Sequence, residues 1–488
     1  MTKKIDAKKL SKILEGHSFK DKTFIGLDGL NVPKFLTESQ RSRHVEIMGL
    51  SGSGKSSSII LPMIFQDICA EKSVVCMDGK GEIQLMQHVL ASLLVKEDFK
   101  REVLGPGKKV PFYYLNPAKP ELSCTYNPVH TNPDTDLLLL TERVFRAFDI
   151  THEHWGPVGL DMLRLLVRAL HATKRQFNLM DIYVCLESSK ARDCLFQETT
   201  DKGAVQQLKW KFDGTQRSRE DAFAQFKVKL QDLGTPILND YNPDILPEDL
   251  LREPSVLCVT LPESHKTLSY GLGNMLMQHL KTAISERFSD PGKNYPPCAI
   301  YLDEIQSYLN PEVMLSALAQ FRSANCQLSF AHQSRHDLKL YSPIVADTIW
   351  VNSQMKIILP TNDPETAEKL SDILGTEKTV VRTYRTAPGP LFTTVPTYEA
   401  SNQEADAYEK HPNLFKKLRP VGQGFLLSPV TGGKEANPMD HESELHWTLE
   451  PLNFARFPEE ITHPLSPPSR IKRGNLEGLH LYARFVAK

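Results

Sequence analysis

The stretch that decides the fold reads Gly49-Leu50-Ser51-Gly52-Ser53-Gly54-Lys55-Ser56. It fits the pattern G-x-x-x-x-G-K-[ST] at every fixed position. Val45-Glu46-Ile47-Met48 before it predicts a short strand, and residues 57–61 after it predict the start of a helix. A glycine-rich turn between a strand and a helix points backbone N–H groups inward, which suits a bound triphosphate. The stretch therefore predicts a phosphate-binding loop.

Individual residues of this loop have expected tasks. Lys55 is expected to neutralise the β and γ phosphates of ATP, and the Ser56 hydroxyl is expected to ligate Mg²⁺. The predicted nucleotide-binding residues are Gly49, Ser51, Gly52, Ser53, Gly54, Lys55, Ser56 and Ser57.

A second element of the same chemistry lies far along the chain. Ala299-Ile300-Tyr301-Leu302-Asp303-Glu304 predicts a buried strand that ends in two acids, on a strand next to that of the phosphate-binding loop. We expect Asp303 to hold the water shell of the metal and Glu304 to polarise the attacking water as general base. An acidic pair can also simply begin a loop, but the glycine loop favours the functional interpretation. No N-K-x-D segment for guanine recognition occurs, so ATP is the expected nucleotide.

Two further residues are candidates because phosphoryl transfer depends on stabilising charge on the γ-phosphoryl group. Arg322 follows a predicted helix over residues 311–320 and could reach the nucleotide of a neighbouring subunit as an arginine finger. Gln333 ends the apolar run 328–332 and could sense the γ-phosphate. Taken alone, Arg322 also fits a surface arginine and Gln333 a strand-end amide.

Composition narrows the class of protein. With 488 residues, 40% of them hydrophobic and 24% charged, the chain is globular, and 58 Lys and Arg balance 59 Asp and Glu. Contact with nucleic acid would therefore need local basic patches, such as the basic residues between 174 and 229 around Trp210 and Phe212. A solvated helical face explains these basic residues equally well, because acids are mixed in. No window is apolar enough to predict a membrane span.

The order of predicted elements divides the chain. Strands that alternate with helices predict an α/β fold with a mostly parallel sheet, and helical periodicity without β-branched runs predicts an all-α insertion. The expected units are a leader at 1–40, the first part of a nucleotide-binding domain at 41–134, the insertion at 135–245, the second part at 246–430, and a Pro-rich, loosely packed tail at 431–488.

These motifs together resemble the TraG/TraD family of type IV coupling ATPases, which link conjugation or secretion channels to their cargo. Asp78-Gly79-Lys80-Gly81-Glu82 looks like the D-x-K-G-E motif of that family, and Tyr126-Asn127-Pro128 looks like its N-P turn. The spacing of Glu304, Arg322 and Gln333 is similar to the family's acidic pair, finger arginine and sensor glutamine. The segments 352–357 and 363–375 are similar to a late strand and helix of that family.

The resemblance implies a RecA-like P-loop NTPase interrupted by an all-α domain, in hexameric rings that use ATP and Mg²⁺. It implies DNA, nucleoprotein or protein cargo and type IV secretion channel components as partners. Many members carry amino-terminal membrane helices, which this sequence does not predict. We therefore expect a cytoplasmic protein, either a naturally soluble or anchorless member of the family or one that a partner holds peripherally at the inner membrane. Two alternatives stay open: a HerA/FtsK-like DNA translocase without a secretion partner, and a cargo receptor with a structural ATP site.

Overall fold

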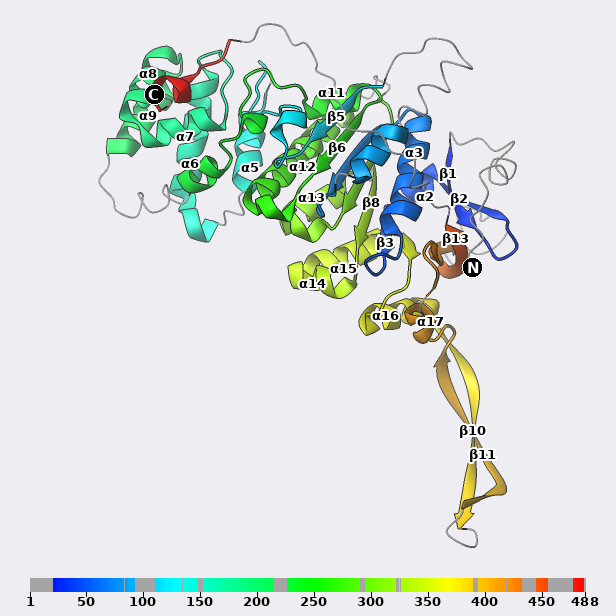
Figure 1. Cartoon of the computed structure of the whole chain (residues 1–488). Helices are drawn as coiled ribbons and strands as arrows, with labels where there is room; N and C mark the ends of the chain where they lie inside the picture. Colours follow the sequence, from blue (N-terminus) through cyan, green and yellow to red (C-terminus); the bar gives the residue numbers. More distant parts are fainter. Residues whose placement is uncertain are drawn as a thin grey trace, which may run out of the picture.

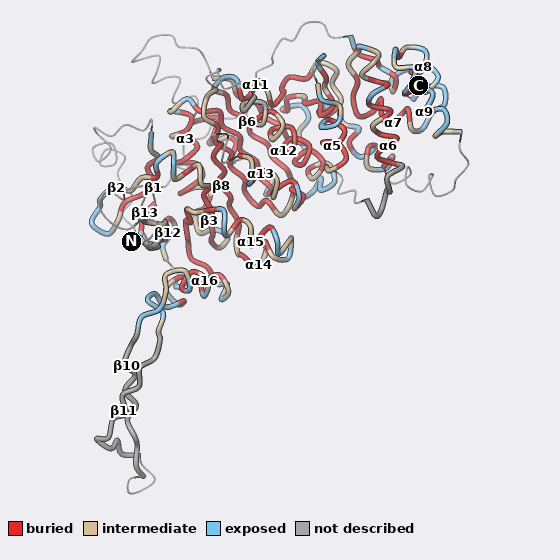
Figure 2. Tube along the Cα trace, turned by 180° about the vertical axis from the view of Figure 1, so that it is seen from behind, coloured by how far each residue is buried: buried red, intermediate tan, exposed pale blue. Residues whose placement is uncertain are grey.

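A computed structural model of the chain describes residues 21–82, 84–92, 110–133, 135–147, 152–213, 226–289, 295–321, 324, 326–388, 394–417, 419–431, 445–454 and 477–486. One large sheet runs through the body with helices on both faces, as Figure 1 shows. A lobe of helices extends from one end of the sheet, and a long hairpin projects near the other end. Buried residues are concentrated in the sheet and in the helices that cover it (Figure 2).

The central sheet has eleven strands in the order β2-β1-β13-β12-β9-β3-β8-β7-β4-β6-β5. They are β1 (Lys22–Leu27), β2 (Pro33–Thr37), β3 (Val45–Met48), β4 (Ser73–Asp78), β5 (Phe112–Leu115), β6 (Val256–Thr260), β7 (Cys298–Asp303), β8 (Cys326–His332), β9 (Met355–Ile358), β12 (Gln423–Thr431) and β13 (Leu445–Phe454). Every neighbouring pair from β9 to β5 is parallel. The pairs from β9 through β12, β13 and β1 to β2 are antiparallel.

Helices cover both faces of the parallel strands. The helices of the described residues, including those of the lobe, are α2 (Glu38–Arg41), α3 (Leu61–Cys69), α5 (Leu137–Ala147), α6 (His152–His171), α7 (Leu179–Glu187), α8 (Ser189–Glu198), α9 (Lys202–Asp213), α11 (Pro247–Arg252), α12 (Lys266–Ser289), α13 (Pro311–Phe321), α14 (Arg335–Tyr341), α15 (Pro343–Asn352), α16 (Pro364–Leu374), α17 (Asn413–Lys416) and α18 (Leu481–Phe485), with short turns η1 (Lys55–Ile60), η2 (Pro120–Leu122), η3 (Pro236–Leu238), η4 (Glu263–His265) and η5 (Ile305–Ser307). On β4, Val74 faces the buried cluster around α3, whereas Val75 faces the cluster around α12 and α13. This alternation leaves both faces of the strand covered.

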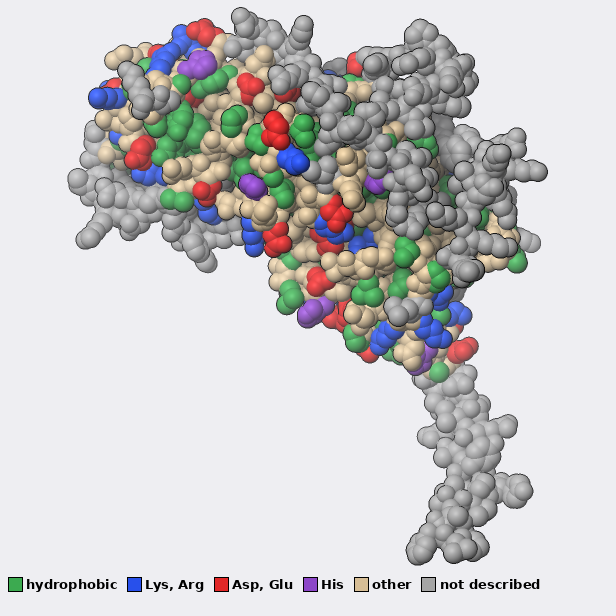
Figure 3. Space-filling model, in the orientation of Figure 1, with side chains coloured by type: hydrophobic (Ala, Val, Ile, Leu, Met, Phe, Trp, Pro, Cys, Tyr) green, Lys and Arg blue, Asp and Glu red, His purple; other side chains and the backbone are tan. Residues whose placement is uncertain are grey.

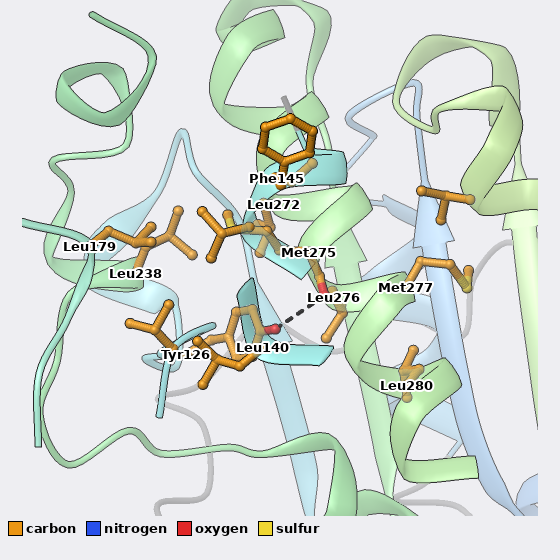
Figure 4. Close-up of a cluster of buried hydrophobic side chains, with 14 of the residues drawn as sticks. Tyr126, Leu140, Phe145, Leu179, Leu238, Leu272, Met275, Leu276, Met277 and Leu280 are labelled. Carbon is orange, nitrogen blue, oxygen red and sulfur yellow. Dashed lines mark hydrogen bonds between the residues drawn. The ribbon is translucent and has the colours of Figure 1, made fainter. Parts of the chain in front are cut away.

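Between β5 and β6, the described residues form helices and contribute no strand to the sheet. The apolar core of this helical segment continues directly into the core beside the sheet. Figure 4 shows Leu140 and Phe145 of α5 beside Leu272 and Met275 of α12. Tyr126 joins the same cluster, and its hydroxyl donates a hydrogen bond to the Met275 carbonyl oxygen at 3.3 Å. The helical segment is therefore fixed to the sheet by a shared core.

The expected leader at 1–40 does not stand apart from the sheet. Residues 22–27 and 33–37 form β1 and β2, which pair with each other, and β1 pairs with β13. Phe24, Ile25 and Leu36 are buried, so these strands belong to the core. Residues 1–20, for which the sequence also predicts leader structure, lie outside the described residues.

The expectation of a loosely packed tail at 431–488 is wrong for two of its segments. β13 lies inside the sheet between β1 and β12, where it pairs with β12 from Gln423↔Asn453 to Thr431↔Leu445. Its Leu452 and Phe454 are buried against the core. α18 packs beside α7 and α8 at the far end of the molecule, with Leu481 fully buried. The proline-rich composition of the tail hides both segments, because the pairing and burial that hold them come from distant parts of the chain.

A second sheet consists of only β10 (Thr376–Pro388) and β11 (Thr394–Tyr408), which pair in an antiparallel hairpin. The hairpin projects far from the body below α16 and α17 in Figure 1. Within the described ranges, none of the helices combines the length and the apolar character that crossing a membrane would need.

Candidate active site

The predicted phosphate-binding loop lies where the chain passes from β3 to η1 and α3. Gly52 has φ of 75° and Gly54 has φ of 101°, a region that residues with a side chain rarely adopt. A Cβ atom on Gly54 would also lie 2.9 Å from both Ser58 Oγ and Val421 Cγ1. Glycine is therefore required at position 54 by both backbone and space. All the predicted binding residues from Gly49 to Ser57 lie in this one turn and the first turn of the helical segment.

The Lys55 side chain is folded over the loop. Its Nζ donates hydrogen bonds to the Gly49 carbonyl oxygen at 2.7 Å and the Leu50 carbonyl oxygen at 3.3 Å. Burial lowers the pKa of Lys55, and the nearby ammonium of Lys80 lowers it further. The loop carbonyls are neutral partners, so an arriving phosphate would offer this ammonium a stronger one.

The acidic pair lies beside the loop. Asp303 ends β7, and its Oδ2 accepts a hydrogen bond from Ser56 Oγ at 3.1 Å, although the two residues are 247 positions apart. Asp303 is 2% exposed, and within the described part of the chain its Oδ1 has no hydrogen-bond partner. A hydroxyl and a carboxylate at this distance, with one carboxylate oxygen unused, fit the oxygen ligands that Mg²⁺ prefers. The residues present therefore fit a magnesium ion held between Ser56 and Asp303.

One detail of the sequence prediction is wrong. β7 is not the neighbour of β3, because β8 lies between them and pairs with both. The carboxyl end of β8 therefore lies between the phosphate-binding loop and the acids, and it carries Gln333. Gln333 Nε2 donates to Glu304 Oε1 at 3.3 Å, and Gln306 Nε2 donates to Glu304 Oε2 at 2.6 Å. The structure thus brings Gln333 and Glu304 together.

Glu304 is held in an unusual backbone conformation. Its φ of 53° lies in the left-handed region, and its N–H donates to the Ala331 carbonyl oxygen at 2.9 Å. Such a conformation costs a residue with a side chain roughly 1 kcal/mol or more. It persists here because β8 fixes the backbone and two amides fix the carboxylate. Arg322, the third predicted catalytic residue, lies outside the described residues.

Sequence reasoning gave Lys80 no task, yet it contacts both acids. Its Nζ lies 3.2 Å from Asp303 Oδ2 and 3.6 Å from Glu304 Oε1. Burial opposes the charged form, but Asp303 and Glu304 outweigh it and raise the pKa of Lys80. Burial and the Asp303 charge raise the pKa of Asp78 to about 6. The D-x-K-G-E pattern was the available signal, although it does not show where the lysine points.

The sequence analysis also did not predict a buried ion cluster on the strands next to the phosphate-binding loop. Glu46 of β3 contacts His332 Nε2 at 3.0 Å and Lys356 Nζ at 2.7 Å. These residues come from three adjacent strands, β3, β8 and β9. Because His332 directly precedes Gln333, the cluster ties the end of β8 to the strand that leads into the phosphate-binding loop.

Three residues of the predicted basic surface on the helical segment, Arg175, Lys211 and Lys227, are paired with acids. Lys211 contacts Asp161 at 2.6 Å and Lys227 contacts Glu187 at 2.7 Å. Arg175 contacts Glu198 and Glu477. On the face shown in Figure 3, basic and acidic side chains are mixed over this lobe. These pairs favour a solvated face, although Trp210 is 70% exposed.

Comparison with known proteins finds a similar fold in coupling proteins. Residues 297–410 match the family model described as the TraM recognition site of TraD and TraG. The unbound conjugative coupling protein TrwBΔN70 aligns with a TM-score of 0.54 at 16% identity, over 95% of this chain and 94% of that chain. The plasmid coupling protein TrwB with the ATP analogue ADPNP gives 0.58 at 15% identity, over 97% of each chain. TrwB with ADP and Mg²⁺ gives 0.56 at 16% identity, over 96% of each chain. A search of curated proteins found no match.

The predicted fold class is confirmed, since the chain is an α/β protein with a mostly parallel, RecA-like sheet that a helical segment interrupts. Its strands bring the glycine loop, the acidic pair and Gln333 to one edge, as the fold requires. The chain therefore has the fold seen in conjugative coupling proteins, and its residues 297–410 match the family model of the TraM recognition site of TraD and TraG.

Proposed function

We propose that this chain is a conjugation coupling protein that hydrolyses ATP with Mg²⁺ and recruits or pumps DNA or nucleoprotein cargo for a type IV secretion channel. The single observation that carries the ATPase part is the 3.1 Å contact between Ser56 Oγ and Asp303 Oδ2. It joins the two halves of a nucleotide site that are separated by the whole helical segment. TrwB structures with ADPNP and with ADP and Mg²⁺ support the same ligands.

Each site residue has a proposed task in hydrolysis. Ser56 and Asp303 would hold Mg²⁺, which polarises phosphoryl oxygens when bound. Lys55 would exchange the loop carbonyls for the β and γ phosphates. Glu304 would accept a proton from water as the water oxygen bonds to the γ phosphorus and the bond to the β,γ-bridging oxygen breaks. Gln333 holds one oxygen of Glu304 and so orients the base.

The partners are proposed from the matched region. Residues 297–410 include the acidic pair, Gln333 and the projecting hairpin, and the matching family model is a TraM recognition site. We infer that a DNA-bound partner docks on this region and brings cargo close to the nucleotide site. A homo-oligomer, expected as a hexamer, would place Arg322 of one subunit near the nucleotide of the next.

Steady-state ATP hydrolysis, with and without single- or double-stranded DNA, tests the proposal. Lys55→Ala and Glu304→Gln should each lower turnover by roughly 10²-fold or more, since a general base alone contributes about 10²–10⁴-fold. DNA should stimulate the unchanged protein. Glu304→Gln should still bind a non-hydrolysable ATP analogue, because the phosphate cradle is intact.

Glu263→Gln is the matched control, since Glu263 is exposed on η4, and it should leave turnover unchanged. Near-normal turnover in Glu304→Gln would remove the proposed base. Nucleotide binding without turnover in the unchanged protein would favour a cargo receptor with a structural ATP site. DNA-driven translocation without any secretion partner would favour the HerA/FtsK-like alternative.

A further inference from the structure

The loop after β4 is built to aim Lys80 at the acidic pair. Asp78 Oδ1 accepts the Lys80 N–H and Asp78 Oδ2 accepts the Glu82 N–H, both at 3.0 Å. One carboxylate thus clamps the backbone on both sides of Gly81, whose φ is 77°. The backbone of the loop is therefore fixed at Lys80 itself and again at Glu82, two residues later.

The same loop is pressed against the turn that follows the acids. A Cβ atom on Gly79 would lie 2.1 Å from Ser307 Oγ and 3.0 Å from the Glu304 carbonyl oxygen. A Cβ atom on Gly81 would lie 2.8 Å from Pro262 Cβ. The two glycines therefore allow the lysine between them to approach Glu304 closely, which explains the residue types at four of the five positions in Asp78-Gly79-Lys80-Gly81-Glu82.

Lys80 shares one oxygen atom with the proposed metal site. Asp303 Oδ2 accepts hydrogen bonds from both Ser56 Oγ at 3.1 Å and Lys80 Nζ at 3.2 Å. A divalent cation held by Ser56 and Asp303 would lie close to this ammonium and repel it. The Lys80 side chain is 27% exposed, so it has room to move. The ammonium and the metal are therefore competitors for Asp303.

We propose that Lys80 exchanges partners during the nucleotide cycle. Without nucleotide, its ammonium neutralises the buried carboxylates of Asp303 and Glu304. With ATP and Mg²⁺ bound, Asp303 would serve as a ligand of the metal, and Lys80 would leave Asp303 and turn to the negatively charged γ-phosphoryl group. Glu304 then loses its cationic partner and is free to accept the proton from water. This inference rests on the proposed ATPase function and adds a second phosphate-binding lysine to it.

The exchange has a readout that needs no turnover. In Lys80→Ala the two acids lack their ammonium, so Mg²⁺ alone should bind there and raise the melting temperature, whereas Mg²⁺ alone should shift the unchanged protein much less. The variant should also lose preference for a non-hydrolysable ATP analogue over ADP by roughly 10-fold, because a charge-assisted contact to the γ-phosphate is worth about 1.5–3 kcal/mol. ATP turnover by Lys80→Ala should fall as well.

Lys80→Arg is the conservative variant and should keep the weak response to Mg²⁺ alone, since the charge remains. Lys266→Ala, at an exposed lysine, should behave as the unchanged protein in every assay. If Lys80→Ala does not fold, Lys80→Gln provides the same comparison. Equal Mg²⁺ responses and equal nucleotide preferences in the unchanged protein and Lys80→Ala would overturn the inference. Failure of the unchanged protein to bind ATP would instead overturn the proposed function.

Discussion

At the scale of single residues, Glu46 carries a negative charge inside the sheet. Glu46 and Lys356 are each 1% exposed and lie 2.7 Å apart, and His332 lies 3.0 Å from the same carboxylate. Burial alone would raise the pKa of Glu46, but Lys356 and His332 outweigh burial and lower the pKa to about 2. An ion pair this deep is stable only while both partners are present.

We therefore predict that Glu46→Gln destabilises the fold by about 3–5 kcal/mol, because it leaves the Lys356 ammonium buried without a counter-charge. Urea denaturation measures the change. Glu46→Gln combined with Lys356→Met should recover part of the loss, since no isolated charge remains. A single variant as stable as the unchanged protein would contradict the prediction.

The ion pair between Glu46 and Lys356 also predicts a loss of folding stability at low pH. Because the folded-state pKa of Glu46 is below its ordinary value of 4.5, its contribution to stability is complete above about pH 4.5 and is lost as the pH falls toward 2. The free energy of unfolding, followed from about pH 7 to about pH 3, should decline less steeply in the double variant than in the unchanged protein. Equal slopes would show that other groups govern acid unfolding.

Which site residues the sequence can predict depends on how local their signal is. The glycine loop and the pair Asp303 and Glu304 each lie within a few residues of the strand that positions them. Their patterns can therefore be recognised in the sequence. Lys80 meets Asp303 across 223 positions, and only the paired strands β4 and β7 bring them together. In the sequence, Glu46 is only a polar residue within a predicted strand. Its ion-pair partners lie on two other strands, so the sequence around it gives no sign of the cluster.

At the scale of elements, the carboxy-terminal segment 477–486 packs into the core of the helical lobe and stabilises it. Leu479 and Leu481 are fully buried in the shared core. The Gln176 N–H donates to the Glu477 carbonyl oxygen at 3.0 Å, and the Leu479 N–H donates to the Gln176 carbonyl oxygen at 2.8 Å. The Tyr482 N–H donates to Asp181 Oδ1 at 3.1 Å. A segment from the end of the chain thus completes the core of helices that lie more than 200 positions earlier.

Leu481→Ala should therefore destabilise the lobe by about 2–5 kcal/mol, the usual cost of removing a buried leucine side chain. Hydrogen exchange of amides in α7 measures this change locally, while amides in β7 should stay protected. Val486→Ala is the matched control at the other end of the segment, since Val486 is 42% exposed, and it should have little effect. Unchanged hydrogen exchange in α7 would mean that the carboxy-terminal segment does not contribute to the stability of the lobe.

Strands of the parallel sheet could be predicted closely, because burial on both faces makes them continuous apolar runs. The runs at 45–48 and 73–78 are the strands β3 and β4 themselves. β13 could not be predicted, because Pro451 and the polar residues around it obscure the alternation of apolar and polar side chains that marks a strand. The order of strands is equally hidden, since nothing in the sequence of β8 states that it separates β3 from β7.

At the scale of the whole molecule, the path of the chain bears on how subunits cooperate. β7 and β8 are parallel neighbours, so α13 must return the chain from the site edge to the opposite edge of the sheet. Phe321 ends α13, and Cys326 begins β8 at that opposite edge. The residue after Phe321 is Arg322, and the sequence predicts that it acts as a finger on the nucleotide of a neighbouring copy.

Mixing two inactive variants tests this cooperation. Arg322→Ala subunits keep an intact nucleotide site but supply no finger, whereas Lys55→Ala subunits keep Arg322 but have a damaged site. If the arginine acts in trans, about a quarter of the interfaces in an equal, random mixture would pair an intact site with an intact finger, so ATP hydrolysis should reappear. Mixing Lys55→Ala with Glu304→Gln should give no such recovery, because both variants damage the same site. Absence of recovery at every mixing ratio would remove Arg322 from the site, while the roles of Lys55, Asp303 and Glu304 would still rest on their own contacts within one chain.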